Sequence, residues 1–252
     1  MMNVKAEYKE TLQHPPSRQI LGDSYNQRLF SGNWRSSLHL SRFYWLKKKM
    51  QELNLQRPRI IELGCHDGKT IEFLGGDPKE YLGLDANWEG GLDLGRMKWK
   101  NFPHLRFQEC IKPSDIPLPT VPYNVGICME TLEHIPPDLV LPYLKKLSDV
   151  IEGFLFITVP VERGVAFFLK HGLKKLLRMR DDNFEDGEFM NCVMGRLDKV
   201  KRFEHKGFDD RLFVEQVREY FDITSVSGVF PRLPVLSMNL TIGIVAKTKS
   251  LR

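Results

Sequence analysis

The order of apolar segments predicts one α/β domain built around a mostly parallel sheet, with helices on both faces. From residue 36 onward, short strand-like segments alternate with segments of helical periodicity, and this alternation is typical of parallel sheets. The last two strand-like segments have no helical segment between them, which predicts a C-terminal antiparallel hairpin. The length of 252 residues suits one such domain with insertions, or at most two small domains.

Composition indicates an ordinary globular protein. Hydrophobic residues make up 42% of the chain and charged residues 27%, which allows a core of normal size. No apolar run approaches the roughly 20 residues that span a bilayer, and residues 1–10 lack the apolar stretch of a secretory signal. The net charge of +5 favours an anionic partner only weakly.

The cysteines indicate a reducing compartment. No two of them form a C-x-x-C pair, so we expect free thiols rather than a disulfide framework or a zinc site. We therefore expect a cytoplasmic protein, with peripheral contact at the inner face of the membrane as an alternative. The cysteines are Cys65, Cys110, Cys128 and Cys192.

The individual elements follow from periodicity and from turn-forming residues. Residues 1–35 mix polar and aromatic side chains around His14-Pro15-Pro16, so we expect an irregular N-terminal arm before a main domain over residues 36–252. The predicted helices span residues 36–55, 68–74, 136–151 and 209–220. Pro142 should kink the third of these or mark its true start. The predicted strands span residues 59–63, 81–85, 105–108, 124–129, 153–159, 222–229 and 239–247.

A glycine-containing turn follows the first predicted strand, in the sequence Glu62-Leu63-Gly64-Cys65-His66-Asp67-Gly68. Gly64 and Gly68 allow the backbone to turn sharply and to approach a ligand, and the next helix begins with free amides that suit a carboxylate. About twenty residues later the second strand ends at Asp85, where an acid can accept both hydroxyls of a ribose. Together these features predict a nucleoside cofactor rather than a loop glycine and a surface acid.

Around this motif, over residues 40–160 and 205–247, the sequence resembles the class I S-adenosylmethionine-dependent methyltransferases. Glu62, Gly64 and Gly68 match the family's first motif, whereas His66 stands where a middle glycine is common. The resemblance implies a Rossmann-like seven-stranded sheet and S-adenosylmethionine as the cofactor. A nicotinamide or flavin dinucleotide is the alternative, but those sites prefer G-x-G-x-x-G, which this turn lacks.

The resemblance also assigns cofactor contacts to the ends of four strands. Glu62 and the backbone of the glycine turn would hold the methionine part, and Asp85 would hold the ribose. Glu109 falls where the family's third strand meets the adenine edge, and Met129 falls beside the sulfonium. The implied cofactor-binding residues are Glu62, Gly64, Cys65, Gly68, Asp85, Ala86, Asn87, Glu109, Cys110 and Met129.

A second cluster follows the fourth strand, in the sequence Glu130-Thr131-Leu132-Glu133-His134. In a turn or short helix Glu130 is spaced to converge with Glu133 and His134, and such a set suits Mg²⁺ or Mn²⁺. The segment resembles O-methyltransferases of the ubiquinone-biosynthesis type and 3′-terminal ribose methyltransferases of small RNAs. Members of both groups can use this pattern as metal ligands together with a downstream histidine, and His205 occupies the comparable place.

Three interpretations of this cluster stay open at the level of sequence. Glu130, Glu133, His134 and His205 could bind a metal that polarises a substrate hydroxyl. His134 or His205 could instead act as a metal-free general base, with Glu130 beside the sulfonium. Finally, the set could be structural.

Segment 161–206 is too long for an ordinary loop, and we expect it to cover the substrate. Residues 163–180 alternate basic and apolar side chains at helical spacing, which predicts an amphipathic helix. This helix could cap the domain, lie on an anionic membrane or contact RNA, and the cap is favoured. The acidic residues over 181–186 read as a solvated turn.

These observations predict methyl transfer from S-adenosylmethionine to a small or lipid-linked molecule. The segments 159–160 and 205–209 look like those of bacterial methyltransferases in sugar and surface-glycan pathways, which favours a hydroxyl of a sugar or glycan, followed by a quinone-type phenol. The alternatives are 2′-O-methylation of an RNA 3′ end and a non-catalytic methyltransferase-like binding subunit. Nucleic acid is not favoured, because the basic helix lacks the interleaved aromatics of a single-strand groove.

Overall fold

The computed structural model describes residues 34–176, 184–185, 187–203 and 205–249. Of the expected N-terminal arm only residues 34 and 35 fall in this part, and they open the first described helix. The expected acidic turn over 181–186 lies outside the described residues except for 184 and 185.

The predicted fold class is confirmed, because the chain forms a seven-stranded sheet of order β3-β2-β1-β4-β5-β7-β6. Neighbouring strands from β3 to β5 pair in parallel, and β7 pairs antiparallel with both β5 and β6. The strands are β1 (Arg59–Leu63), β2 (Glu80–Asp85), β3 (Leu105–Glu109), β4 (Tyr123–Met129), β5 (Ile151–Pro160), β6 (Phe221–Phe230) and β7 (Thr241–Thr248).

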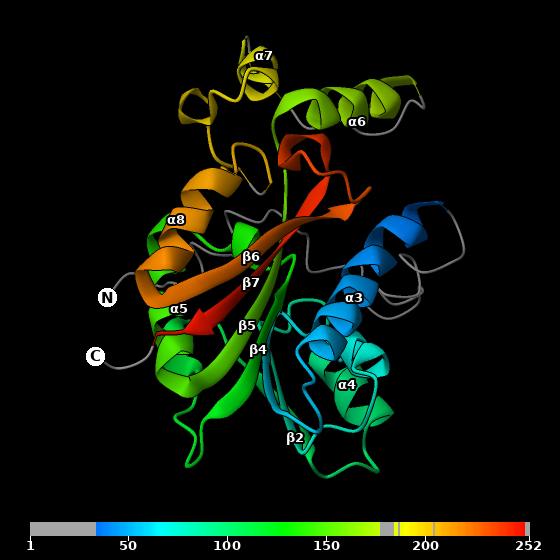
Figure 1. The fold of residues 1–252 in the computed structure, drawn as a ribbon, viewed down its shortest axis with the longest axis vertical. Coiled ribbons are helices and arrows are strands. Elements are labelled where there is room, and N and C mark those ends of the chain that lie inside the picture. The colour runs from blue at the N-terminus through cyan, green and yellow to red at the C-terminus, as the bar shows by residue number, and fades with distance from the viewer. Residues whose placement is uncertain (1–33, 177–183, 186, 204, 250–252) are drawn as a thin grey trace.

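Helices cover both faces of this sheet (Figure 1). The described α-helices are α3 (Trp34–Glu52), α4 (Gly91–Lys98), α5 (Pro137–Val150), α6 (Gly164–Leu176), α7 (Glu188–Val193) and α8 (Asp210–Tyr220). Short 3₁₀ helices also occur, and those used below are η1 (Lys69–Phe73), η3 (Leu132–His134) and η4 (Leu197–Lys199).

Each face of the sheet has its own hydrophobic core because adjacent side chains of a strand point in opposite directions. In β1, Ile60 packs with α3 and α4, while its neighbour Ile61 packs with α5 and α8. The α3 side contributes Trp45, whose indole lies edge-on to Phe156 with ring centroids 6.3 Å apart. Figure 1 shows these two helix pairs on opposite sides of the sheet.

Three local expectations need correction. The helix expected over 68–74 is the 3₁₀ helix η1, because it begins after Gly68 in a left-handed conformation (φ 73°) and Gly75 (φ 80°) follows its end closely. Pro142 lies inside α5 and does not mark its start. Helix α4 was not expected, because three glycines in and beside it weaken its helical signal.

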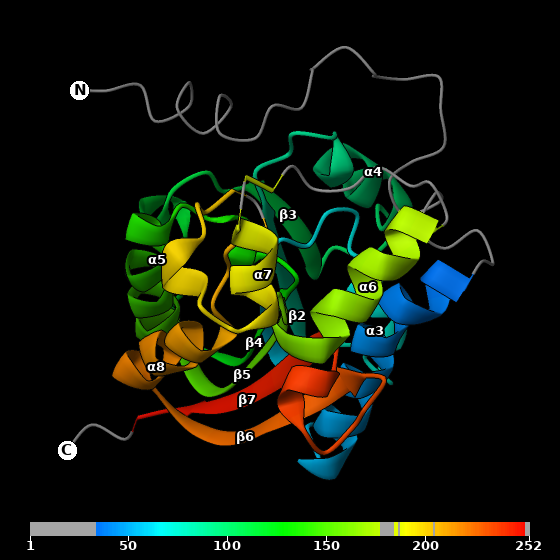
Figure 2. The same ribbon diagram turned by 90° about the horizontal axis from the view of Figure 1, so that it is seen from above.

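The segment between β5 and α8 forms a small unit over the edge where β5 ends (Figures 1 and 2). Helix α6 lies within the helix predicted over 163–180, and residues 177–180 fall outside the described part. The unit between β5 and α8 has a small hydrophobic core of its own, formed by Phe167, Cys192, Leu197 and Val200. Among the described helices, none is both long and apolar enough to cross a membrane.

Candidate functional site

The glycine turn after β1 is held tightly against β2. The amides of Gly64 and Cys65 both donate to the carbonyl of Leu84, at 2.7 and 3.1 Å. Gly64 has a φ of 79°, and a Cβ atom at this position would lie 2.1 Å from Oγ1 of Thr131. Glycine is therefore required here both by the left-handed backbone and by the close approach of the loop after β4.

Glu62 stabilises this turn through buried hydrogen bonds. Its carboxylate is buried and accepts hydrogen bonds from Thr70 Oγ1 at 2.5 Å and from the Tyr81 hydroxyl at 2.6 Å. Burial raises the pKa of Glu62 to about 7, although both hydrogen bonds act in the opposite direction. Glu62 thus ties β1 to η1 and β2, while a direct contact between its carboxylate and a cofactor stays a prediction.

His66 replaces the expected middle glycine without blocking the turn. Its backbone is left-handed (φ 48°), and its ring lies against Gly91, where a Cβ atom would come within 2.6 Å of the imidazole. Nε2 of His66 lies 3.9 Å from the Glu89 carboxylate. Because Gly91 has no Cβ atom, it leaves room for the His66 ring, whose position the sequence alone did not predict.

Asp85 joins two loops at the edge of the sheet. One carboxylate oxygen accepts from the amide of His66 at 3.0 Å, and the other accepts from the amide of Asn87 at 2.8 Å. The carbonyl of Asp85 accepts from the amide of Cys110 at 2.8 Å, which adds the loop after β3. Because each carboxylate oxygen can accept more than one hydrogen bond, the half-buried carboxylate can still accept from a ligand.

The other predicted cofactor residues follow the same edge. Asn87 has a left-handed backbone (φ 56°), and its side-chain oxygen accepts from the amide of Leu92 at 3.1 Å. Met129 is buried, and its sulfur accepts a hydrogen bond from Thr158 at 3.4 Å. Ala86 is half-buried beside Asp85, while Glu109 is exposed. The structure thus brings these residues together at the carboxyl ends of β2, β3 and β4.

Two of the predicted contacts are cysteines that keep their protons. Cys65 and Cys110 are both buried. Burial raises the pKa of Cys110 to about 12 and the pKa of Cys65 well above its usual value. Neutral thiols cannot serve as charged ligands, and both S–H groups donate to backbone carbonyls, of His66 and of Lys112.

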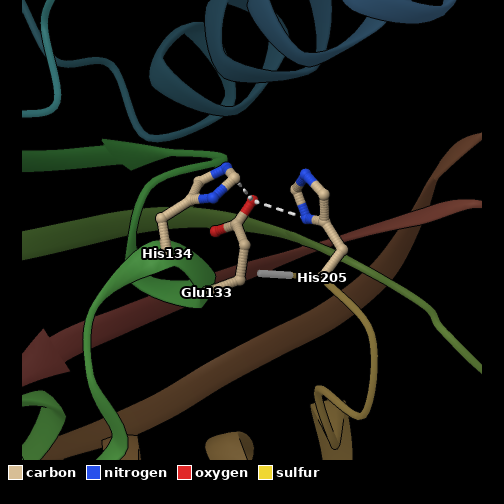
Figure 3. A group of neighbouring side chains, drawn as sticks. All are labelled: Glu133, His134 and His205. Carbon is tan, nitrogen blue, oxygen red and sulfur yellow. Dashed lines mark ion pairs between the residues drawn. The ribbon is translucent and has the colours of Figure 1, made fainter. Parts of the chain in front are cut away.

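A second group lies at the end of β4, where Glu133, His134 and His205 converge (Figure 3). Nε2 of His134 and Nδ1 of His205 each lie 3.9 Å from Oε1 of Glu133. The two imidazole rings are 4.4 Å apart between centroids, and one ligand atom from each residue lies within 4.8 Å of the others. Two imidazoles and one carboxylate are a usual donor set for a divalent transition metal.

Glu133 is buried in an unusual environment for a carboxylate. Its side chain is 0% exposed, and among the described residues none donates a hydrogen bond to either of its carboxylate oxygens. Burial, reinforced by neighbouring Glu130, raises the pKa of Glu133 well above its usual value. A bound cation or a retained proton would relieve the cost of this burial.

Glu130 lies beside this group but is not part of it. The expected convergence required one helical turn from Glu130 to His134, whereas Glu130 has a left-handed backbone (φ 52°) and η3 begins only at Leu132. Burial raises the pKa of Glu130 too, and the nearby cations Arg42 and Lys170 oppose this shift. Of the four expected metal ligands, Glu133, His134 and His205 therefore lie close enough together to share one ion, and Glu130 does not join them.

The insertion holds His205 in place through its neighbour Lys206. The Glu188 carboxylate accepts from Lys206 Nζ and from the amides of Lys201 and Glu185, each at 2.9 Å. Lys206 is 8% exposed, and its ion pair lowers the pKa of Glu188 to about 2. No local pattern predicts this contact, because Glu188 is far from His205 along the chain.

Two arginines near the site were also missed. Arg202 donates a hydrogen bond of 2.6 Å to the carbonyl of Glu133. The positive charge of Arg42, on α3, opposes the rise in pKa that burial causes at Glu62, Glu130 and Glu133. Its buried Nε has no hydrogen-bond acceptor among the described residues. Apolar periodicity identifies α3, but it does not reveal that one polar side chain turns toward the carboxylates.

Comparison with known proteins gives a structural relationship only. No protein-family model matches the sequence, and no curated protein matches it. Among solved structures, an S-adenosylmethionine-dependent methyltransferase from Clostridium acetobutylicum ATCC 824 is similar with a TM-score of 0.64 and 14% identity, over 90% of this chain and 99% of that chain.

Two further structures extend this likeness. The N-methyltransferase NodS from Bradyrhizobium japonicum WM9, in complex with S-adenosyl-L-homocysteine, has a TM-score of 0.54 and 8% identity, over 98% of this chain and 100% of that chain. The methyltransferase domain of bacterial CtHen1 has a TM-score of 0.55 and 13% identity, over 83% and 99% of the two chains. The chain therefore has the fold of the class I S-adenosylmethionine-dependent methyltransferases.

Replacing Glu188 with glutamine should destabilise the protein by roughly 3 kcal/mol, because it removes the negative charge that pairs with the buried ammonium of Lys206. Since the wild-type pKa is about 2 instead of the ordinary 4.5, this contribution is complete above pH 4.5 and is lost as the pH falls toward 2. Urea unfolding across this pH range measures the difference.

The matched control for this variant is Glu215→Gln, which removes an exposed partner of Arg218 and should change stability by less than about 1 kcal/mol. Equal stabilities of Glu188→Gln and wild type at neutral pH would show that the Glu188 ion pair does not hold the His205 turn.

Proposed function

We propose that this chain is an S-adenosylmethionine-dependent methyltransferase. The observation that carries the proposal is the half-buried Asp85 carboxylate, which accepts hydrogen bonds from two backbone amides in neighbouring loops. This carboxylate can still accept hydrogen bonds from a ligand. This arrangement suits a ribose diol at the end of β2, and it occurs in a chain with the methyltransferase fold. The four described cysteines are buried and none forms a disulfide, which fits a cytoplasmic enzyme.

The cofactor would lie across the ends of β1, β2 and β4. The turn from Gly64 to Gly68 suits its amino-acid tail, and the guanidinium of Arg42 supplies a charge for the tail's carboxylate. Asp85 would accept from the ribose, and the loop at Cys110 would border the adenine. When bound, the cofactor supplies a methyl group on a positively charged sulfur, which an acceptor attacks in line.

The residues around Glu133 would act on the methyl acceptor. A hydroxyl acceptor must lose a proton as it attacks, and an imidazole of His134 or His205 can take this proton. Buried Glu133 lies 3.9 Å from both rings, so it would stabilise the imidazolium that forms. These groups favour transfer to oxygen.

The same residues fit a divalent cation such as Mn²⁺ or Mg²⁺. Glu133 would supply a carboxylate whose oxygens have no hydrogen-bond donor among the described residues, and His134 and His205 would supply nitrogens, which suit Mn²⁺ better than Mg²⁺. Such an ion would polarise the acceptor hydroxyl and lower its pKa. Glu130 would then contribute charge nearby without direct coordination.

The acceptor that we favour is a hydroxyl of a small or lipid-linked molecule, such as a sugar, a glycan or a quinone-type phenol. The 3′-terminal ribose of an RNA is the second candidate, since it too offers a hydroxyl. Labelled methyl incorporation into the lipid, glycan and RNA fractions of a cell extract separates these acceptors. A chain that binds no S-adenosylmethionine would instead be a non-catalytic relative of the family.

Asp85→Asn should weaken S-adenosylmethionine binding about ten- to hundredfold, because a charged acceptor for the ribose hydroxyls is lost. Isothermal titration calorimetry measures the affinity, and Asp149→Asn, which changes an exposed partner of Lys145 on α5, is the control that should bind like wild type. An Asp85→Asn protein that is folded and binds with unchanged affinity would refute the ribose assignment.

Removal of divalent ions by a chelator should abolish methyl transfer, and Mn²⁺ should restore it more effectively than Mg²⁺. Glu133→Gln should weaken Mn²⁺ binding by at least about tenfold, because the anionic ligand is lost, without changing the affinity for S-adenosylmethionine. Turnover in chelator at the full wild-type rate would contradict the metal assignment and leave the histidines as the general base.

A further inference from the structure

Helix α6 presents an apolar face to solvent. Its outward side chains recur at helical spacing, and each is between 42% and 78% exposed. They are Val165, Phe168, Leu169, Leu173 and Leu176. The solvent-facing side of a surface helix is normally polar, and a continuous apolar strip of this kind marks an interaction surface.

The opposite face of α6 already has its packing partners. Ala166, Phe167 and His171 are buried, and the rings of Phe167 and Phe189 are 5.6 Å apart. Nζ of Lys170 lies 2.5 Å from the Glu162 carboxylate. The outward strip is therefore additional to the contacts that pack α6 on the protein.

The helix that carries the strip has basic side chains and no acidic one. Over α6 the sequence has Lys170, Lys174 and Lys175 and no aspartate or glutamate. Arg163 and Lys170, on the inner side, are paired with Asp210 and Glu162, so Lys174 and Lys175 supply the positive charge of the helix. A basic segment with an apolar face is suited to an anionic bilayer, where apolar side chains enter the boundary of headgroups and acyl chains and the cations meet lipid phosphates. We infer that α6 docks this protein on an anionic lipid membrane.

Other partners fit this surface less well. Two copies that packed through α6 about a twofold axis would bring like charges together without a compensating acid on the segment. An RNA would meet the cations but would leave five large apolar side chains in contact with phosphates and water. A bilayer satisfies both features of the segment at once.

Docking through α6 would bring the candidate site close to the lipid. Helix α6 begins shortly after β5 ends, and Lys170 on its inner side influences the pKa of Glu130. β4 and β5 pair in parallel, so the start of α6 and Glu130 lie at the same edge of the sheet. This last step rests on the proposed methyl transfer and favours a lipid-linked acceptor, whereas membrane docking itself does not depend on that chemistry.

The test is sedimentation of the full chain with vesicles of phosphatidylglycerol and phosphatidylcholine in equal parts, and with vesicles of phosphatidylcholine alone. Wild type should bind the anionic vesicles and not the neutral ones. The double variant Leu169→Glu/Leu176→Glu places charges on two residues that are 62% and 78% exposed, so it should fold normally. Its binding should fall about tenfold or more, because both apolar contacts are lost.

The matched control is Leu118→Glu/Leu212→Glu, which changes two leucines that are 73% and 60% exposed away from α6 and should bind like wild type. Equal vesicle binding by wild type and the α6 variant would overturn the proposal, as would a wild type that binds no anionic vesicles. A dimer that dissociates in the α6 variant, without lipid binding, would make α6 a contact between copies. Calorimetry with S-adenosylmethionine on the same proteins shows separately whether the cofactor site is intact.

Discussion

The arrangement of the site depends on the Asp85 carboxylate, which accepts hydrogen bonds from backbone amides in two loops, one after β1 and one after β2. β1 and β2 are parallel neighbours, so their carboxyl ends meet at one edge, and Asp85 fixes the loops that leave them. The buried carboxylate of Glu62 likewise joins separate elements, because it accepts hydrogen bonds from Thr70 on η1 and from Tyr81 on β2. Two acids thus determine the shape of the turn on which the proposed cofactor would rest.

The acceptor side of the site is assembled from more distant parts of the chain. Glu133 and His134 come from the short helix after β4, whereas His205 comes from the insertion and is placed by the contact of Glu188 with Lys206. A buried carboxylate between two imidazoles is costly unless a proton or a cation accompanies it. The same insertion exposes the apolar face of α6, so one segment both completes the proposed catalytic group and offers a surface for lipid.

Local patterns predicted most of the fold and part of the site. The strands were predicted because their apolar runs are short and bounded by turn residues. Gly64, Gly68 and Asp85 were placed at one edge of the sheet because they lie at or just after strand ends, and their contact with a cofactor stays a prediction. Helix α4 was missed because Gly91 and Gly95, which make room for His66 and Phe107, weaken its pattern. The remaining errors concern tertiary contacts: Arg42, Glu188 and the separation of Glu130 depend on backbone conformation and long-range packing that no local spacing encodes.

The most direct test of the account is a crystal structure of the chain with S-adenosyl-L-homocysteine. We predict that both ribose hydroxyls lie within hydrogen-bonding distance of the Asp85 carboxylate and that the amino-acid tail lies over the turn from Gly64 to Gly68. A ligand bound elsewhere on the chain, or an Asp85 carboxylate directed away from the ribose, would contradict the account.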